Sequence, residues 1–298
     1  MKFLLIDSFI HRKNRIGFDL MCKSKNIEYV VSKNQEDYSK EWDLVFIPAE
    51  SMNPCMFPKT KCIMYGPHNF VFVNGVWKKS TFEFPANCFY NLLSRWITDI
   101  QDEFGGLSLK VETFPFAVDV DTFKPLENKN EPEYDCFVYY KARDPKILDF
   151  VAKTLQMKKL RFIVIRYGKY TEEEYKTILN STKFGIWVGC HESQGFALEE
   201  CLSTNVPLLV WNVTSMFDEY NNEGEIAYTQ ELGKYILRAT SIPYWDDRCG
   251  LVFTEKENFI PSLEQMQTSY QNYSPRKYIL ETLTPSICMD RILAKISI

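Results

Sequence analysis

Short apolar runs alternate with longer amphipathic segments along most of the chain. A short apolar run is typical of a buried strand, whereas apolar positions at i, i+3 and i+4 predict an amphipathic helix. In the first part of the chain the pattern predicts a helix at 95–104 and strands at 3–6, 27–31, 44–47, 62–65, 88–92 and near 109–114. In the second part it predicts strands at 135–140, 161–165, 184–188 and 208–211, and helices at 146–155, 172–179 and 196–203. This alternation predicts the α/β class, with parallel strands.

The length of 298 residues is typical of two domains. The polar stretch 121–133 contains Pro125 and Pro132, lacks apolar periodicity, and is the best boundary region. We expect domains at 1–115 and 116–275, followed by a final helix at 276–298 that crosses back to the first domain. Open α/β sheets bind ligands beyond the carboxyl ends of their strands, so we expect a site in a cleft between two facing sheets.

Composition and charge exclude several classes of protein. The apolar fraction of 45% and charged fraction of 25% are those of a folded globular protein. The net charge of −4 argues against nucleic acid as the main partner. The aromatic fraction of 15% suits a large core, or a surface near 65–77 on which a carbohydrate stacks.

Cysteine spacing and hydropathy bear on the cellular compartment. The nine cysteines are scattered and never spaced as Cys-x-x-Cys, so the sequence indicates neither a zinc site nor a disulfide framework. The apolar run after Lys2 is too short for a signal peptide, and no run approaches the ~20 apolar residues that span a bilayer. We therefore expect a reduced, soluble, cytoplasmic protein.

The segment 184–210 carries the most chemical information. A strand ends there in a polar loop that contains Glu192 and Gly195, and a helix begins directly afterwards. The free N–H groups at the start of that helix attract a phosphate or diphosphate, and glycine allows its close approach to the backbone. Glu200 lies within the second helical turn, where a carboxylate can accept both hydroxyls of a ribose.

These residues resemble the Glu-x7-Glu signature of retaining nucleotide-sugar glycosyltransferases of family 4. The match consists of Glu192, Gly195 and Glu200, followed by the strand at 206–209. Asn205 stands where the family usually has glycine, and both residues tolerate a left-handed helix end. The resemblance implies a GT-B fold, with a Rossmann-like acceptor-side domain followed by a Rossmann-like donor domain. The alternative is a generic strand-loop-helix unit in which both glutamates are solvated.

The resemblance also implies roles for individual residues. Donor-binding candidates are Lys141, Arg166, Ser193, Gln194, Gly195, Phe196 and Glu200. Catalytic candidates are Glu192, His68, Arg143 and Lys146. The cations would stabilise the departing diphosphate, although each of them could instead be a solvated surface residue. His68, which follows a strand end, would lie beside the reacting sugar, or would only fix a turn.

Three further features are open to more than one reading. The family commonly has a glycine pair in the first loop; here 7–17 lacks it, although Lys13, Asn14 and Gly17 remain candidates for phosphate or acceptor binding. Asp119 and Asp121 look like a metal-binding Asp-x-Asp, but the surrounding sequence resembles the family's interdomain segment, so we expect no metal site. The lysine-containing stretch 55–80 is a solvated rim, or faces an anionic acceptor or a membrane surface.

The function that this resemblance implies is retaining transfer of a hexose or pentose from a nucleotide-diphosphate sugar. The acceptor would be a glycan, a lipid or a small molecule, with no cofactor, no metal and no nucleic acid partner. The alternatives are an epimerase or hydrolase of the same fold, or a non-catalytic module that binds sugar nucleotides or glycans. A dinucleotide-dependent oxidoreductase is disfavoured, because no Gly-x-Gly-x-x-Gly follows a predicted strand.

Overall fold

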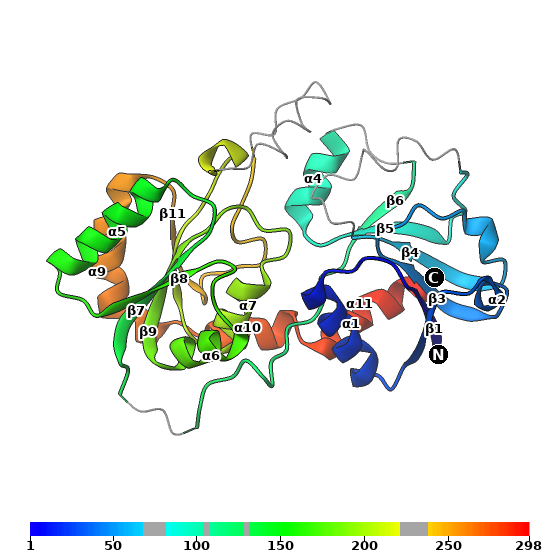
Figure 1. The fold of residues 1–298 in the computed structure, drawn as a ribbon, viewed down its shortest axis with the longest axis horizontal. Helices are drawn as coiled ribbons and strands as arrows, with labels where there is room; N and C mark the ends of the chain where they lie inside the picture. Colours follow the sequence, from blue (N-terminus) through cyan, green and yellow to red (C-terminus); the bar gives the residue numbers. More distant parts are fainter. Residues whose placement is uncertain (68–81, 104–107, 128–130, 221–237, 298) are drawn as a thin grey trace. The chain divides into compact units, whose positions relative to one another are not determined.

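The computed structural model describes residues 1–67, 82–103, 108–127, 131–220 and 238–297. The chain divides into two compact units. Unit 1 comprises Met1–Asp119 together with Thr282–Ile298, and unit 2 comprises Val120–Glu281. Figure 1 shows unit 1 in blue and cyan with a red C-terminal helix, and unit 2 in green through yellow to orange-red. Each unit is built on one parallel sheet, as the alternation of apolar runs and helices predicts.

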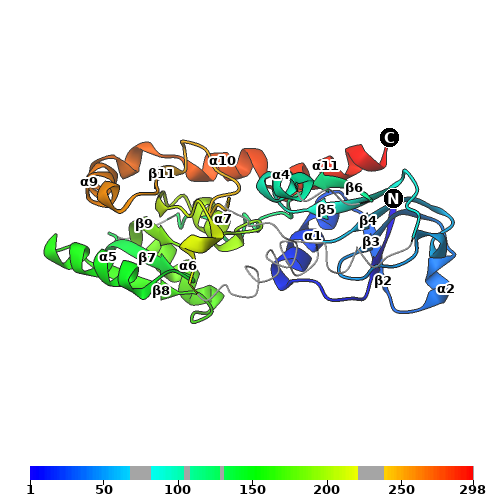
Figure 2. The same cartoon turned by 90° about the horizontal axis from the view of Figure 1, so that it is seen from above.

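Unit 1 has a six-stranded sheet in the order β2-β1-β3-β4-β5-β6. Its strands are β1 (Lys2–Ile6), β2 (Glu28–Ser32), β3 (Trp42–Ile47), β4 (Thr60–Tyr65), β5 (Cys88–Leu92) and β6 (Lys110–Thr113). Its helices are α1 (Arg12–Ser24), α2 (Gln35–Tyr38), α4 (Arg95–Glu103) and α11 (Pro285–Ile296), with the 3-10 turn η1 (Pro54–Met56). Figures 1 and 2 show α1 and α11 side by side, so the end of the chain packs against its beginning.

The expectation of a loop over 7–17 is wrong, because α1 already begins at Arg12. Phe18, Met21 and Cys22 form a buried stripe on this helix at the i, i+3, i+4 spacing. Gly17 is buried there, and a Cβ at this position would lie 2.8 Å from the carbonyl oxygen of Ala117. Glycine therefore permits close packing of α1 against the segment after β6.

Unit 2 has a five-stranded sheet in the order β11-β10-β9-β7-β8. Its strands are β7 (Tyr134–Tyr140), β8 (Phe162–Arg166), β9 (Thr182–Val188), β10 (Leu208–Trp211) and β11 (Gly250–Phe253). Its helices are α5 (Pro145–Met157), α6 (Glu172–Asn180), α7 (Phe196–Ser203), α9 (Phe259–Ser269) and α10 (Pro275–Thr282). Short 3-10 turns are η2 (Met216–Asp218), η3 (Lys256–Asn258) and η4 (Tyr270–Asn272).

The two faces of this sheet are covered by different helices. Alternate residues of β7 and β9, such as Val138 and Ile186, join α5 and α9 in one core. On the other face the Tyr139 and Trp187 rings stack with centroids 3.8 Å apart, and Tyr139 also contacts Tyr175 of α6. Part of the aromatic excess therefore lies in the core.

The final helix predicted at 276–298 is in fact two helices, α10 and α11. The break has a local cause, because Thr284 has an extended backbone and caps α11, with its hydroxyl accepting a hydrogen bond from Ile287 N. Pro285 follows at the first helical position, where proline is favoured, and it cannot continue the preceding helix. α10 begins at Pro275, and proline is favoured at this first helical position too.

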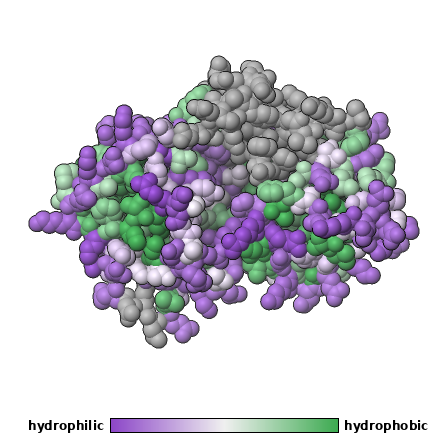
Figure 3. Space-filling model, viewed as in Figure 1, coloured by the Kyte–Doolittle hydropathy of each residue, from purple (hydrophilic) through white to green (hydrophobic). Residues whose placement is uncertain are grey.

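The cysteines and the surface agree with the composition. All nine cysteines lie within the described residues, where they form no disulfide bond, and all but Cys55 are buried. The face drawn in Figure 3 carries apolar patches separated by polar side chains. Within the described ranges, no helix combines the length and the apolar character that crossing a bilayer requires.

Candidate functional site

The sheet order of unit 2 brings three strand ends together. Lys141 directly follows β7, Tyr167 directly follows β8, and Glu192 lies in the loop after β9. These strands are neighbours and parallel, so their carboxyl ends share one edge of the sheet. The backbone N–H of Lys141 donates to Val188 O at 3.0 Å, and that of Tyr167 donates to Tyr140 O at 3.0 Å. This edge is where open α/β sheets bind ligands.

Lys141 and Glu192 form an ion pair at this edge. Their Nζ and Oε1 atoms lie 2.7 Å apart, and their side chains are only 18% and 15% exposed. Burial alone would lower the pKa of Lys141, but the charge and hydrogen bond of Glu192, together with Cys190 and Tyr167, outweigh burial and raise that pKa. The ammonium also lies 4.6 Å from the centroid of the Tyr167 ring. Lys141 therefore carries its charge in a sheltered position.

Helix α7 begins beside this pair. Its N-cap is Gly195, with a left-handed φ of +94°, and glycine has no side chain of its own to cap the first turn. A left-handed φ favours glycine, and an uncapped helix start presents N–H groups and a positive dipole end to an anion. Glu200 lies one turn into the helix and is 5% exposed. We call Lys141, Tyr167, Glu192, Gly195 and Glu200 the strand-end site.

The Tyr170 hydroxyl links the charges of the strand-end site. Burial raises the pKa of Tyr170; a hydrogen bond with the Tyr139 hydroxyl lowers it, Glu200 raises it and Lys141 lowers it. The carboxylate of Glu200 and the ammonium of Lys141 therefore both act on one hydroxyl group. The sequence predicts donor-binding roles for both residues, and the pKa of Tyr170 depends on the charge of each.

A third carboxyl group, that of Glu199, lies under the loop after β9. Glu199 is fully buried, and its Oε2 accepts a hydrogen bond of 3.0 Å from Gln194 Nε2. Its Oε1 has no hydrogen-bond partner among the described residues. Burial raises the pKa of Glu199 well above its ordinary value, the Gln194 bond opposes this, and Glu200 and Glu192 raise it further. The Gln194 side chain is therefore held against the buried face of α7 by its bond to Glu199, whereas Ser193 and Phe196 are half-buried.

The other predicted cations occupy different surroundings. Arg143 is 4% exposed and donates to the carbonyl oxygens of Gly189 and Trp211, at 3.1 Å each. Burial lowers its pKa, against the raising effect of nearby carboxylates. Lys146 is exposed on the first turn of α5. Arg166 is exposed too, and lies over the Tyr140 ring at 5.5 Å.

Sequence reasoning missed a contact between His191 and Glu219. His191 Nδ1 lies 2.7 and 2.9 Å from the two carboxylate oxygens of Glu219, and the backbone N–H of His191 donates to the same carboxylate at 2.6 Å. Cys190 directly precedes His191 in the loop after β9, and its thiol donates to His191 O at 3.4 Å. The position of His191 beside Glu192 was a usable signal, whereas nothing in the sequence marks Glu219 as its partner.

Several other predicted residues lie in unit 1 or outside the described residues. His68 lies outside the described residues, as do Lys78 and Lys79, so their roles stay predictions. Asn14 and Gly17 are buried in α1 of unit 1, and Lys13 is half-buried in the same helix. Of the aromatic stretch 65–77, Tyr65 is buried and donates through its hydroxyl to Met52 O at 2.9 Å.

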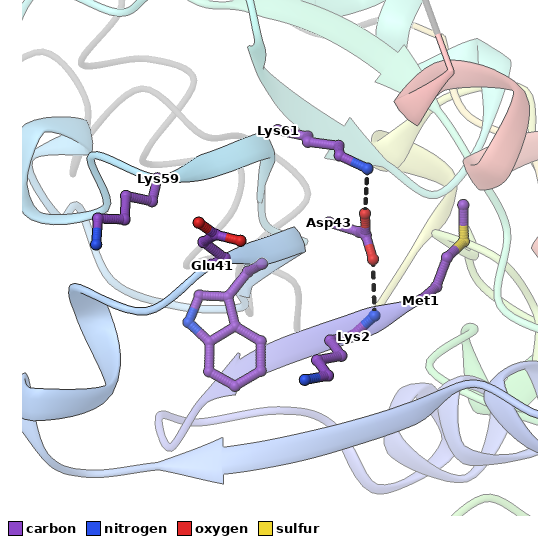
Figure 4. A pocket seen from close by; sticks show the side chains of 7 residues that line it. Met1, Lys2, Glu41, Asp43, Lys59 and Lys61 are labelled. Carbon is purple, nitrogen blue, oxygen red and sulfur yellow. Dashed lines mark hydrogen bonds and ion pairs between the residues drawn. The ribbon is translucent and has the colours of Figure 1, made fainter.

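Unit 1 has a pocket at the amino ends of its strands, which is the sheet edge opposite to their carboxyl ends. Figure 4 shows it lined by Lys2 of β1, Asp43 of β3, and Lys59 and Lys61 at the start of β4. Asp43 accepts from the Lys2 N–H at 2.8 Å and pairs with the Lys61 ammonium at 2.5 Å. These are the amino ends of parallel strands, whereas open α/β sheets bind ligands beyond the carboxyl ends. The pocket is therefore not the candidate site.

The two sheets and their helices define the class of fold. Both units are Rossmann-like, and the chain has the two-domain fold of GT-B glycosyltransferases. No protein-family model matches the sequence, and no curated protein is significantly similar to it in sequence. The likeness is therefore one of structure.

Three solved structures illustrate the likeness. The glycosyltransferase AviGT4, involved in avilamycin A biosynthesis, has a TM-score of 0.57 at 10% identity, over 99% of this chain and 97% of its own. Anabaena Alr3699/HepE, in complex with UDP and glucose, has a TM-score of 0.56 at 8% identity, over 100% and 99%. The lipopolysaccharide outer core galactosyltransferase WaaB has 0.55 at 12%, over 100% and 99%. At these identities the likeness shows the fold alone.

Proposed function

We propose that this protein is a retaining glycosyltransferase that uses a nucleoside diphosphate sugar as donor. The observation that carries the proposal is the Lys141–Glu192 ion pair, 2.7 Å long, beside the uncapped start of α7. Glu200 adds a buried carboxylate one helical turn further on. The similar folds support the proposal, since AviGT4 and WaaB are glycosyltransferases and Alr3699/HepE has been solved in complex with UDP-glucose.

The strand-end site has the groups that such a donor needs. The N–H groups that follow Gly195 would bind the diphosphate, because they lack a capping side chain and lie at the positive helix end. Lys141 would stabilise the negative charge of the departing diphosphate without a metal ion. Glu200 would accept the two ribose hydroxyls, and Glu192 would contact the transferred sugar. Glu192 thereby has two partners, Lys141 and the sugar.

The proposed step keeps the configuration of the anomeric carbon. The bond from that carbon to the diphosphate oxygen breaks, and a bond to the acceptor oxygen forms on the same face of the sugar. The acceptor proton passes to the departing diphosphate oxygen, so no protein base is required. The protein contributes orientation and charge stabilisation. The transferred sugar is a hexose or a pentose, and the acceptor carries a hydroxyl on a glycan, a lipid or a small molecule.

A thermal-shift panel tests the donor class first. Nucleoside diphosphates and their sugars should raise the melting temperature, because a ligand that binds only the folded state stabilises it. Glu200→Gln should lose most of this shift for ribonucleotides, through weaker ribose binding. Glu257→Gln is the matched control, since Glu257 is an exposed glutamate of the same unit. An equal shift in all three proteins would contradict the assigned ribose role.

Turnover is tested next with the nucleotide sugar that binds best. Transfer to an acceptor, with retained anomeric configuration by NMR, is the expected result, and Glu192→Gln should reduce the rate at least tenfold. Release of free sugar or an epimerised donor without acceptor would favour the hydrolase or epimerase alternative. Binding without turnover over a wide acceptor panel would favour a binding module.

A further inference from the structure

The loop after β9 carries a second cluster of chemically active side chains beside the strand-end site. Cys190 and His191 are consecutive, and Glu219 follows η2. One ligand atom from each residue, a sulfur, a ring nitrogen and a carboxylate oxygen, lies within 4.8 Å of the other two. The cluster is sheltered, since Cys190 is 6% exposed and the side chains of His191 and Glu219 are 11% and 1% exposed.

We propose that Cys190, His191 and Glu219 form a binding site for one Zn²⁺ ion per chain. A thiolate and an imidazole are ligands that select zinc over magnesium or calcium, and a carboxylate oxygen completes a three-residue set that zinc accepts. A water molecule would take the fourth tetrahedral position, as it does at other zinc sites with three protein ligands.

The distances are compatible with this ion after small movements. Zinc binds nitrogen and oxygen at about 2.0 Å and sulfur at about 2.3 Å, so tetrahedral ligand atoms lie about 3.3 to 3.6 Å apart. His191 Nδ1 and Glu219 Oε1 are 2.7 Å apart, so this pair would open by roughly 0.6 Å as the ion enters between the ligands. The Cys190 sulfur lies within 4.8 Å of the other two ligand atoms and would approach them by a side-chain rotation.

Binding changes the protonation of one ligand. Burial raises the pKa of the Cys190 thiol to about 12, although the Lys141 charge opposes this, so the metal-free thiol is protonated at neutral pH. The ion forms bonds to sulfur, nitrogen and oxygen, and the thiol proton is released to solvent. Neither an oxidant nor a further reactant is needed. The bound ion would link the loop after β9 to the end of η2 and stabilise unit 2.

Cobalt provides a direct readout of such a site in the full-length, reduced and metal-stripped protein. Titration with Co²⁺ should reach one ion per chain, with tetrahedral absorption and a thiolate charge-transfer band, and Zn²⁺ should displace it. Cys190→Ser should abolish that band, and Glu219→Gln should weaken zinc binding about tenfold or more. Cys201→Ser should leave both unchanged; it is the matched control, because Cys201 is also buried in unit 2 and its thiol donates to a carbonyl oxygen.

A second measurement needs no variant. Zinc X-ray absorption of the wild-type complex should show one sulfur at about 2.3 Å together with nitrogen or oxygen ligands. A spectrum without sulfur, an unchanged cobalt band in Cys190→Ser, or the absence of stoichiometric binding would each overturn the proposal. In that case the His191–Glu219 contact serves only to order the loop. These readouts do not depend on sugar transfer, so the zinc site and the proposed function can fail separately.

Discussion

Replacing Glu199 with glutamine tests whether the buried carboxyl of α7 is held in its neutral form. Glu199 is fully buried, one of its oxygens has no partner among the described residues, and burial raises its pKa well above the ordinary 4.5. Glutamine has nearly the same shape, can still accept the hydrogen bond from Gln194, and does not titrate. The substitution therefore removes the ionisation and preserves the packing.

The sign of the effect follows from proton binding. In the unfolded chain Glu199 ionises near pH 4.5, whereas the folded state keeps its proton to a higher pH. Between these two pKa values the folded state binds more protons, so its stability falls by about 1.4 kcal/mol per pH unit as the pH rises. Glu199→Gln does not titrate and so does not lose stability in this way. The free energy of unfolding of the variant, relative to that of the wild type, should therefore rise by about 1.4 kcal/mol per pH unit until the pH reaches the folded-state pKa of Glu199.

Hydrogen exchange of the α7 peptide, followed by mass spectrometry, measures the local opening free energy in both proteins. A local measurement is preferable because unfolding of a chain with two units need not be a single two-state transition. The unpartnered amide of the variant adds an offset of about 1 to 3 kcal/mol that is the same at every pH. Glu257→Gln, an exposed change, should show no slope. A constant difference between Glu199→Gln and wild type from pH 5.5 to 8 would refute the neutral carboxyl.

Four further substitutions have defined outcomes. Lys141→Met removes the ion pair with Glu192. It should lower the stability of unit 2 by about 2 kcal/mol, measured by urea unfolding, and weaken nucleoside diphosphate binding about tenfold, measured by calorimetry; unchanged binding would contradict the role of Lys141. Gly195→Ala and Gly168→Ala both place alanine at a left-handed φ and should each lower the stability of unit 2 by about 1 to 2 kcal/mol. Only Gly195→Ala should also weaken nucleotide binding. Gly17→Ala should destabilise unit 1 by about 1 to 3 kcal/mol, because its Cβ would meet backbone at 2.8 Å; a neutral effect in thermal unfolding would show that α1 can shift.

The strands and the α/β class could be predicted because buried parallel strands are short apolar runs that differ sharply from the polar residues on either side. Cys88–Leu92 and Leu208–Trp211 are buried throughout, and the sequence predicts both with the observed bounds. Helix α1 was missed for the converse reason. Its first turn, Arg12–Arg15, is polar and resembles a loop, and its buried stripe begins further along.

The ion pair of the strand-end site depends on the order of the strands in the sheet, which no local sequence motif indicates. Lys141 and Glu192 are 51 positions apart, and each can be named from its local motif. They meet because β7 lies between β8 and β9, so that the first strand of unit 2 is next to the third. The contact of His191 with Glu219 has the same origin, since the end of β10 leads to η2 beside the loop after β9.

The three cations that follow β7 show how backbone geometry separates residues that the sequence treats as equivalent. Ala142 has a left-handed φ of +46°, which is unfavourable for a residue with a Cβ. The turn is held in place by Arg143, which donates to two carbonyl oxygens, and by Tyr220 N–H, which donates to Ala142 O at 2.9 Å. Lys141 precedes this turn and pairs with Glu192, whereas Lys146 lies beyond it and is exposed. Arg143 therefore orients the turn, and Lys141 is the cation best placed to act on a bound diphosphate.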